Sequence, residues 1–496
     1  MGIKAFLTYY FAKYIVSKNK SWKKNALSFQ KNVFYSLLKK AKKTSFGKDH
    51  FFCDISNYED WKKHVPIRDY EELREYIERV VAGEKNVVWP GRPLYLCKTS
   101  GTTSGVKHIP ITKDSMPNHI VAARDAILTY VYETGNKSIV NGKMIFIQGS
   151  PKLKKTNSIL TGRLSGIVAH HVPFYLQSNQ LPSFKTNCID DWEKKINKIS
   201  EETEKENLTL ISGIPPWVQM YFEKLKENTK KNIGDLFPNF QLFIYGGVNY
   251  SPYKKTFEKL IGKTVDGLEL YPASEGFIAY QDSQEEKGLL LCVNHGIFYE
   301  FITVDSFFEE KQKRISLSEV KIGINYAVIL NTNAGLFGYN IGDTVKFVSI
   351  EPYRIVVTGR IKHYTSAFGE HVIAEEVEGA LRLSLEKVYA EIVEFHVAPQ
   401  VNPKNGAPYH EWFIEFAKKP NDILLFEKIL DKNLQNKNSY YRDLICGGVL
   451  KPLKICFVVK GGFKKYMSSV GRLGGQNKVP RLANERKIAD KLILQK

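Results

Sequence analysis

The sequence has few cysteines and lacks any pair of them at metal-binding or redox spacing. Its six cysteines are widely spread and never form a Cys-x-x-Cys motif; they are Cys53, Cys97, Cys188, Cys292, Cys446 and Cys456. This spacing indicates reduced thiols in a reducing compartment, and it argues against both a disulfide framework and a zinc site.

Long hydrophobic runs are missing as well. No run of about 18 or more apolar residues occurs, which excludes a transmembrane helix. The stretch "MGIKAFLTYYFAKYIVSKNK" resembles a targeting signal, but Lys13 interrupts its apolar run and no small-residue cleavage site follows. Its apolar residues recur at helical spacing, which favours a helix that packs on its own domain over a membrane anchor. We therefore expect a cytoplasmic protein with no integral membrane segment.

The positive charge has no concentrated stripe. The formal net charge is +20, yet the lysines are scattered from Lys4 to Lys496 without zinc-finger spacing or an aromatic ribonucleoprotein motif. A solvated surface explains this pattern better than a nucleic-acid partner. The chain also lacks internal repeats and low-complexity tracts. At 496 residues and 43% hydrophobic content, it is long enough for two folded domains.

A glycine- and hydroxyl-rich stretch, "CKTSGTTSGVKHIPIT" at residues 97–112, is present where a phosphate could bind. Backbone N–H groups in such loops can approach an anion closely. The P-loop register is absent, because Gly101 is followed by Gly105, Val106 and Lys107 rather than by Gly-Lys-Ser/Thr at the required spacing. A different kind of nucleotide loop remains possible.

Short β-rich runs alternate with helical patterns between residues 140 and 275, from "KMIFIQ" to "GLELYPASEG". Such alternation predicts a parallel α/β sheet. Successive strands end in small-residue turns at Gly213, at Gly246-Gly247 and at 272–276. Since ligands of open α/β sheets bind at the carboxyl ends of the strands, these turns should converge on one site.

The pattern changes twice further along the chain. Residues 295–360 read as strands without helices, as in "NYAVILNT", "TVKFVSI" and "YRIVVTGR", which predicts an antiparallel β subdomain. Residues 361–496 mix helical and strand patterns and predict a small α+β domain. The fold class is therefore α/β, with a large domain at 1–360 and a smaller one at 361–496.

Each short motif on its own has an ordinary structural interpretation. "SGTTSG" could be a flexible turn, "YPASEG" a strand-to-helix turn, and "YNIGD" a hairpin turn whose Asp343 accepts backbone N–H groups. "TGRIKHYTSAFGEHVIAEEVE" could be a charged linker, and "GGQNKVPR" a terminal loop. Their order along the chain changes this assessment, because five motifs that are each weak evidence rarely occur together in one defined order by chance.

That order resembles the adenylate-forming superfamily, which contains firefly luciferase and the acyl-CoA synthetases. The closer resemblance is to its Gretchen Hagen 3 branch of acyl-acid amido synthetases, through "GLFGYNIGD", "LQNKNSYYRDL" and "GQNKVPR". The resemblance implies an adenylation domain at 1–360 that holds ATP, Mg²⁺ and a carboxylic acid. It also implies a mobile C-terminal lid domain at 361–496, and an amino acid as acceptor.

The resemblance also assigns roles to individual residues. Lys478 is similar to the C-terminal lysine that acts in adenylation, Glu275 to the ligand of Mg²⁺, and Lys107 to a point charge near the phosphates. The remaining positions implied to bind ATP are Ser100, Gly101, Thr102 and Thr103 at the phosphates, Gly246 and Gly247 below adenine, Tyr271, Ala273 and Ser274 in the second motif, and Asp343 with Arg360 at the ribose. Lys362 would sit at the hinge.

The sequence departs from the family at Asn340, where members usually carry Arg after the Tyr of the third motif. The base that would deprotonate the amine is not evident, and His108 and His371 are candidates only by their nearness in sequence to the motifs. The leading hypothesis is an ATP-dependent acid–amino acid ligase. The alternatives are an acyl-CoA ligase with the same first half-reaction and a non-catalytic basic binding protein.

Overall fold

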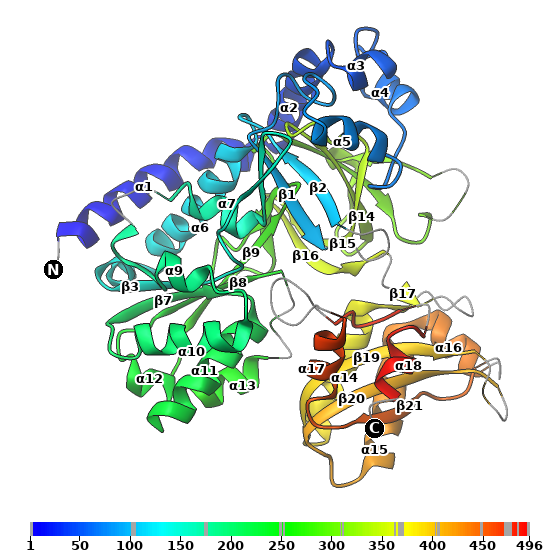
Figure 1. Ribbon diagram of the computed structural model, residues 1–496. Coiled ribbons are helices and arrows are strands. Elements are labelled where there is room, and N and C mark those ends of the chain that lie inside the picture. The colour runs from blue at the N-terminus through cyan, green and yellow to red at the C-terminus, as the bar shows by residue number, and fades with distance from the viewer. Residues whose placement is uncertain are drawn as a thin grey trace. The chain divides into compact units, whose positions relative to one another are not determined.

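A computed structural model gives the fold of the chain (Figure 1). It describes residues 3–100, 106–172, 177–247, 250, 253–307, 309, 312–361, 364–365, 372–401, 403, 407–446, 450–470, 479–483 and 486–493. The chain divides into two compact units, the first comprising 1–341 with 345–356 and the second comprising 342–344 with 357–496. No helix in the described ranges is long and apolar enough to cross a bilayer.

Five helices open the first unit. They are α1 (Ile3–Lys24), α2 (Ala26–Ala41), α3 (Ser45–Asp49), α4 (Tyr58–His64) and α5 (Arg74–Val81). Side-chain oxygens of Thr44 and Asn57 cap α3 and α4 by accepting from backbone N–H groups in their first turns. In Figure 1, α1 lies alongside α6 (Met116–Thr134), and the two helices are in contact.

A twelve-stranded sheet forms the centre of the first unit, in the order β13-β12-β14-β15-β16-β11-β10-β9-β8-β7-β3-β6. Its parallel part has the bounds β3 (Lys143–Ile147), β6 (Gln180–Leu181), β7 (Leu208–Gly213), β8 (Leu242–Gly246) and β9 (Asp266–Ala273). The helices among these strands are α9 (Phe184–Asn187), α10 (Trp192–Thr203), α11 (Pro215–Thr229), α12 (Ile233–Leu236) and α13 (Lys254–Ile261). The parallel pairings of β3, β7, β8 and β9 confirm the α/β prediction.

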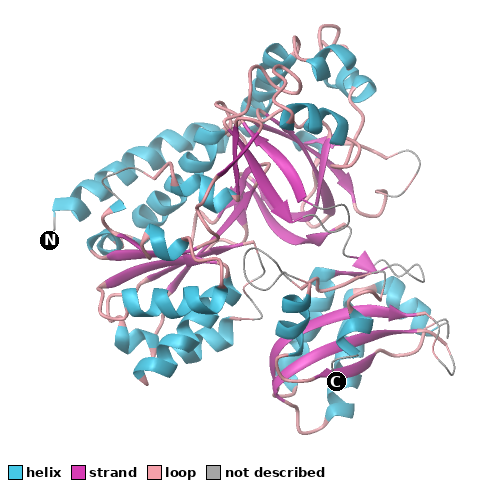
Figure 2. Ribbon diagram, in the orientation of Figure 1, coloured by secondary structure: helices cyan, strands magenta, loops and turns pink. Residues whose placement is uncertain are grey.

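Helices cover the parallel strands on both faces (Figure 2). Successive side chains of a strand point to opposite faces. Leu242 and Ile244 of β8 accordingly belong to the core that includes Ala122 and Ala126 of α6. Phe243 between them belongs to a separate core with the helices α10, α11 and α13. This two-sided burial explains why these strands read as nearly continuous apolar runs.

The antiparallel part of the same sheet follows in sequence. Its bounds are β10 (Gly276–Tyr280), β11 (Leu289–Leu291), β12 (Ile297–Thr303), β13 (Ile315–Ser316), β14 (Asn325–Thr332), β15 (Tyr339–Ile350) and β16 (Tyr353–Arg360). The ladders of β12 with β13 and with β14 are antiparallel, as predicted for this part of the chain. These strands continue the α/β sheet through hydrogen bonding instead of closing a sheet of their own.

A second, four-stranded sheet carries the glycine- and hydroxyl-rich stretch. Its order is β2 (Val106–Ile111), β1 (Tyr95–Ser100), β5 (Ile159–Gly162) and β4 (Lys154–Thr156), and α7 (Leu164–Ala169) follows β5. β1 is antiparallel to β2 and parallel to β5. The carboxyl ends of β1 and β5 therefore lie at the same edge of this sheet.

The second unit is a small α+β fold. Its bounds are β17 (Tyr364–Thr365), β18 (Val372–Ile373), α14 (Ala374–Lys387), β19 (Glu391–Gln400), β20 (Tyr409–Lys418), α15 (Ile423–Lys437), α16 (Ser439–Cys446), β21 (Lys454–Val458), α17 (Gly462–Ser469) and α18 (Ala489–Ile493). Trp412 and Ile414 of β20 pack with α14 and α15, whereas Phe413 between them packs with α17 and α18. The predicted α+β character of this part of the chain is confirmed.

Candidate active site

The turn between β9 and β10 holds the second predicted motif. Ala273 pairs with Gly276 in the antiparallel ladder, so Ser274 and Glu275 form the two-residue turn. The interpretation of this stretch as a strand-to-helix turn is wrong, because residues 276–280 form a buried strand. A two-residue turn holds both side chains at the carboxyl end of β9.

A side-chain contact links β1, the strand that leads into the first predicted motif, to the second motif. The Cys97 Sγ of β1 donates to the Ser274 Oγ at 3.2 Å, between residues 177 positions apart in the chain. Burial raises the pKa of the Cys97 thiol to about 12, so the thiol remains a protonated donor at neutral pH. Cys97 of β1 and the turn at Ser274 therefore lie side by side in the first unit.

Glu275 has a second neighbour from a distant part of the chain. The Tyr339 hydroxyl at the start of β15 donates to the Glu275 Oε1 at 3.3 Å. Tyr339 is buried, whereas Glu275 is only partly buried. A packed residue thus helps to hold the carboxylate in place.

Gly246 ends β8 directly beside this turn. It pairs with Leu270 of β9, and a Cβ at Gly246 would lie 2.2 Å from the Leu270 carbonyl oxygen. Gly247 follows with a φ of +76°, a backbone conformation that favours glycine. Tyr271 is buried in the neighbouring strand. The two glycines therefore allow a close approach of backbone at the carboxyl end of β8.

Asp343 and Arg360 lie in the second unit and contact each other. The Arg360 Nε is 2.8 Å from the Asp343 Oδ1, and their side chains are 48% and 16% exposed. The adjacency implied by the resemblance is therefore present. Their role at a ribose stays a prediction.

Lys107 lies in β2, one residue into the strand from its start. Its Nζ stands 5.2 Å from the centre of the Tyr70 ring, a cation–π distance. The next residue, His108, donates from its backbone N–H to the Tyr70 Oη at 2.8 Å, and burial lowers the pKa of its imidazole. A role of Lys107 at the phosphates and of His108 as a base both stay predictions.

Several predicted residues lie outside the described part of the chain. They are Gly101, Thr102, Thr103, Lys362, His371 and Lys478, together with the side chain of Ser100.

Arg163 is a candidate site residue that the sequence did not reveal. It follows Gly162, the partner of Cys97 in the pairing of β1 with β5. Its side chain lies close to Gly149: a Cβ added to Gly149 would be 3.0 Å from the Arg163 Cδ. The guanidinium is partly buried, and no described residue forms an ion pair or hydrogen bond with it. The nearby Ser165 Oγ is buried without a hydrogen-bond partner among the described residues.

Burial lowers the pKa of Arg163, because removal of water penalises its charged form. A partly desolvated guanidinium without a counter-ion destabilises the fold unless a ligand supplies the anion. Arg163 and Ser165 together therefore fit a carboxylate or phosphate oxygen next to the turn at Ser274.

The described residues fit an adenine nucleotide and one divalent ion. Gly246 and Gly247 leave backbone without side chains at the carboxyl end of β8, which a flat group or a phosphate could approach, and Ser274 offers a hydroxyl in the neighbouring turn. No cluster of three or more His, Cys, Asp or Glu side chains occurs among the residues in the described ranges. A single carboxylate such as Glu275 still suits Mg²⁺, which usually takes most of its ligands from water and substrate phosphates.

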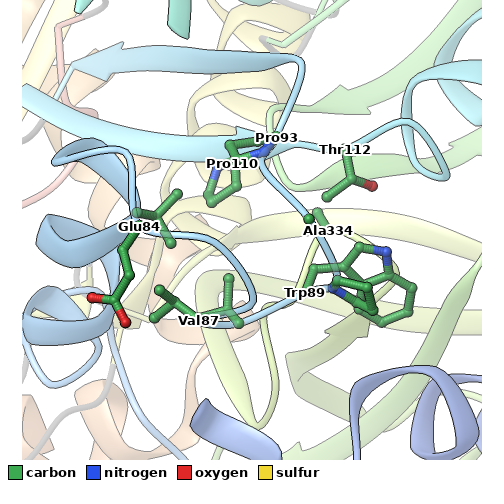
Figure 3. A pocket seen from close by; sticks show the side chains of 11 residues that line it. Glu84, Val87, Trp89, Pro93, Pro110, Thr112 and Ala334 are labelled. Atoms are coloured by element: carbon green, nitrogen blue, oxygen red, sulfur yellow. The ribbon is translucent and has the colours of Figure 1, made fainter. Parts of the chain in front are cut away.

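A small pocket lies elsewhere in the first unit (Figure 3). Its walls come from α5, from residues 87–93, and from Pro110, Thr112 and Ala334. Its one carboxylate, Glu84, is bound by Arg79, which lowers the Glu84 pKa. The pocket contains none of the predicted site residues.

Solved structures of known proteins define the class to which this fold belongs. The chain aligns with 2-hydroxyisobutyryl-CoA ligase, solved in a postadenylation state with 2-HIB-AMP, at a TM-score of 0.58 and 13% identity over 95% of this chain and 90% of that one. It aligns with the GH3.15 acyl acid amido synthetase at a TM-score of 0.80 and 17% identity over 97% of this chain and 95% of that one. The fold is therefore the one that these two ligases share.

Within that class, the chain belongs to the GH3 family. Residues 16–187 match the GH3 family N-terminal domain, residues 290–360 the central domain and residues 375–487 the C-terminal domain. A curated relative, jasmonoyl–L-amino acid synthetase JAR4 of Nicotiana attenuata, is 22% identical over 58% of this chain and 60% of its own length. The chain thus matches somewhat less than two thirds of that relative.

Proposed function

We propose that this chain is an ATP-dependent ligase that activates a carboxylic acid as an acyl-adenylate and then transfers the acyl group to an amino acid. Adenylation would release pyrophosphate, and amide formation would release AMP. The observation that carries the proposal is the contact of Cys97 with Ser274, because it places the strand that leads into the first expected phosphate-binding motif beside the second motif. Membership of the GH3 family supports it, since relatives of that family are named as amido synthetases.

In the proposed reaction, negative charge accumulates on the α-phosphate and on the pyrophosphate leaving group. Mg²⁺ would neutralise part of this charge when bound. Glu275 would hold the ion, oriented by the Tyr339 hydroxyl. Preorganised donors around developing charge commonly make the largest single contribution to catalysis. Lys478 and Lys107 would supply further positive charge, and Ser274 a hydroxyl.

The two domains would have different roles in the reaction. Residues 1–360 would hold ATP and the acid, and residues 361–496 would act as a mobile lid that brings Lys478 to the phosphates. Closure of such a lid excludes water, which would otherwise hydrolyse the adenylate. Asp343, paired with Arg360, would accept hydrogen bonds from the ribose hydroxyls.

Arg163 would bind a carboxylate that does not react. A guanidinium stabilises the charge of a carboxylate and so weakens it as a nucleophile, which makes the attacking carboxylate a poor ligand for it. Two unreactive carboxylates are chemically possible: that of the acceptor amino acid, and a second one on the acyl acid. The absence of an ion pair or hydrogen bond from any described residue to Arg163 supports this role.

Exchange of pyrophosphate into ATP, driven by a panel of carboxylic acids, tests the proposal. We expect at least one aromatic or aliphatic acid to stimulate exchange, followed by AMP release that depends on an added amino acid. A protein that binds ATP but exchanges with no acid would contradict adenylation. The fold likeness to a CoA ligase makes thioester formation the second candidate, and it predicts AMP release that depends on CoA without any amine.

A further inference from the structure

The helix α1 presents two chemically different faces. Its inner face packs against α6: the Asn19 Nδ2 donates to the buried Asp125 Oδ2 at 2.9 Å, and the Trp22 Nε1 donates to the Asn19 Oδ1 at 3.1 Å. Lys23 forms an ion pair with Asp282 at 2.9 Å. The helix is therefore fixed to the first unit along one side, as the sequence predicts.

The outer face carries large apolar side chains that the described structure leaves in solvent. The exposed fractions are 50% for Phe6, 60% for Leu7, 55% for Tyr10, 46% for Phe11 and 61% for Tyr14. These five residues, which we call the α1 stripe, are spaced so that they share one side of a helix. Within the stripe, the rings of Phe6 and Tyr10 lie 4.7 Å apart between centroids. Contiguous apolar patches of this kind commonly mark interaction surfaces.

Positive charge surrounds the α1 stripe. Residues 1–48 contain 12 lysines and no aspartate or glutamate. At 3.6 residues per turn, the exposed Lys4 and Lys13 fall on the two edges of the stripe. Lys18 and Lys24, also exposed, occupy the same side of the helix further along. An apolar stripe rimmed by lysines is the pattern of helices that lie in the interface of an anionic bilayer.

We propose that the α1 stripe docks the protein on an anionic lipid surface. The aromatic rings would enter the boundary between headgroups and acyl chains, where Phe and Tyr are well accommodated. The lysines at its edges would contact lipid phosphates and carboxylates. The inner face keeps its contacts with α6, so docking requires no unfolding. The proposal is independent of the ligase activity.

Charge argues against a second copy of the chain as the occupant. A symmetric contact between two α1 stripes would bring lysine-rich segments together with no acidic residue from 1–48 to pair with them. Like charges at an interface are destabilising unless they are compensated. An anionic membrane supplies the compensating charge.

Co-sedimentation of the full chain with vesicles tests the proposal. The two vesicle compositions are phosphatidylcholine alone and phosphatidylcholine with phosphatidylserine at about 7:3, at low and at physiological salt. We expect binding to the mixed vesicles at least roughly tenfold stronger than to phosphatidylcholine, and weaker binding as salt rises. Equal binding to both compositions, or binding to neither, would overturn the proposal.

Three sets of substitutions assign the binding to the helix. The triple change Phe6→Ser, Tyr10→Ser and Tyr14→Ser removes apolar surface without altering charge, and we expect it to weaken binding by roughly tenfold or more. The change of Lys4, Lys13 and Lys18 to Gln should weaken binding to the mixed vesicles only. The matched control, Phe184→Ser, Ile322→Ser and Leu424→Ser, removes three exposed apolar side chains elsewhere and should bind as the unaltered chain does.

Circular dichroism verifies that each variant is folded. Unchanged binding by the α1 triple variant would overturn the proposal. The proposal would also be overturned if sedimentation velocity showed that the unaltered chain forms an oligomer and the α1 triple variant does not. A second copy of the chain would then cover the α1 stripe.

Discussion

At the scale of single residues, Glu275 is the clearest test of the proposed chemistry. Glu275→Gln keeps the size of the side chain and its contact with Tyr339, but it removes the negative charge that would hold Mg²⁺. We expect the rate of acid-dependent pyrophosphate exchange to fall by on the order of 10²–10³ with unchanged thermal stability. Tyr339→Phe removes only the orienting hydroxyl and should cost several-fold. Equal losses for the two variants would contradict a direct role of the carboxylate.

Arg163 gives a second prediction at this scale. Arg163→Gln should raise the KM of whichever substrate carries the unreactive carboxylate by roughly 10- to 100-fold, the usual range for one charged hydrogen-bonding partner. A rise in KM for the amino acid, with pyrophosphate exchange unaffected, would identify the acceptor as that substrate. A rise in KM for the acid in the exchange reaction would identify a dicarboxylic acid.

The matched control for this test is Arg382→Gln, which removes an exposed guanidinium of the helix α14. The control should change neither KM. If Arg163→Gln also leaves both unchanged, the guanidinium has no substrate to bind and its assignment is wrong.

At the scale of elements, substitution by alanine should change the stability in opposite directions at two glycines. Gly246→Ala places a Cβ 2.2 Å from the Leu270 carbonyl oxygen, so β8 and β9 must separate where they pair. We expect a loss of about 2 kcal/mol or more in the free energy of unfolding, the range for overpacked buried sites. Urea titration measures it.

Gly379→Ala is the counterpart, within the helix α14. Its Cβ would meet the end of the exposed Lys437 side chain, which can move away. Alanine is the better helix former, so the second unit should gain about 0.5–1 kcal/mol. If Gly379→Ala destabilised the fold as much as Gly246→Ala does, the Lys437 side chain would not be moving away from the added methyl group, and the prediction would be wrong.

Elements with a strong pattern could be predicted from the sequence, and elements without one could not. β7 and β8 are short apolar runs followed by the helices α11 and α13, and together with β9 they form the parallel sheet that the sequence predicts. No hairpin between β9 and β10 is predicted from the sequence at "YPASEG". The run "FIAY" directly after Gly276 nevertheless has the composition of a strand. The four-stranded sheet was also missed, because its pairing of β1 with β5 joins segments more than sixty residues apart.

At the scale of the whole molecule, part of the candidate site follows from motif order and part requires coordinates. The motif order predicts that the loop at 100–105 and the turn near 274 meet, and the contact of Cys97, in the strand leading into that loop, with Ser274 is compatible with this prediction without testing it. Arg163 carries no motif signal, because its proposed role depends on a partly buried guanidinium with no partner among the described residues, which no local sequence pattern reveals. The same holds for the α1 stripe: helical spacing showed an amphipathic helix, but only exposure showed that a second apolar face remains.

Buried histidines should make the folded molecule sensitive to acid. Burial lowers the pKa of His119, His295 and His396 to about 4, whereas an unfolded histidine titrates near 6.5. Between these values the unfolded chain binds more protons than the folded one, so the stability is complete above about pH 6.5 and is lost as the pH falls toward 4. Each histidine should contribute a loss of about 2 kcal/mol between pH 7.5 and 5.

Urea unfolding of the full chain at the two pH values measures this loss. His119→Gln removes one of the titrating groups, so its free energy of unfolding should decrease less between pH 7.5 and 5 than that of the unaltered chain. The comparison uses the difference between pH values and not the stability at one pH, because glutamine at position 119 also alters packing in a way that does not depend on protons. An identical pH dependence for His119→Gln and the unaltered chain would mean that His119 is protonated without cost in the fold, contrary to its burial beside His295.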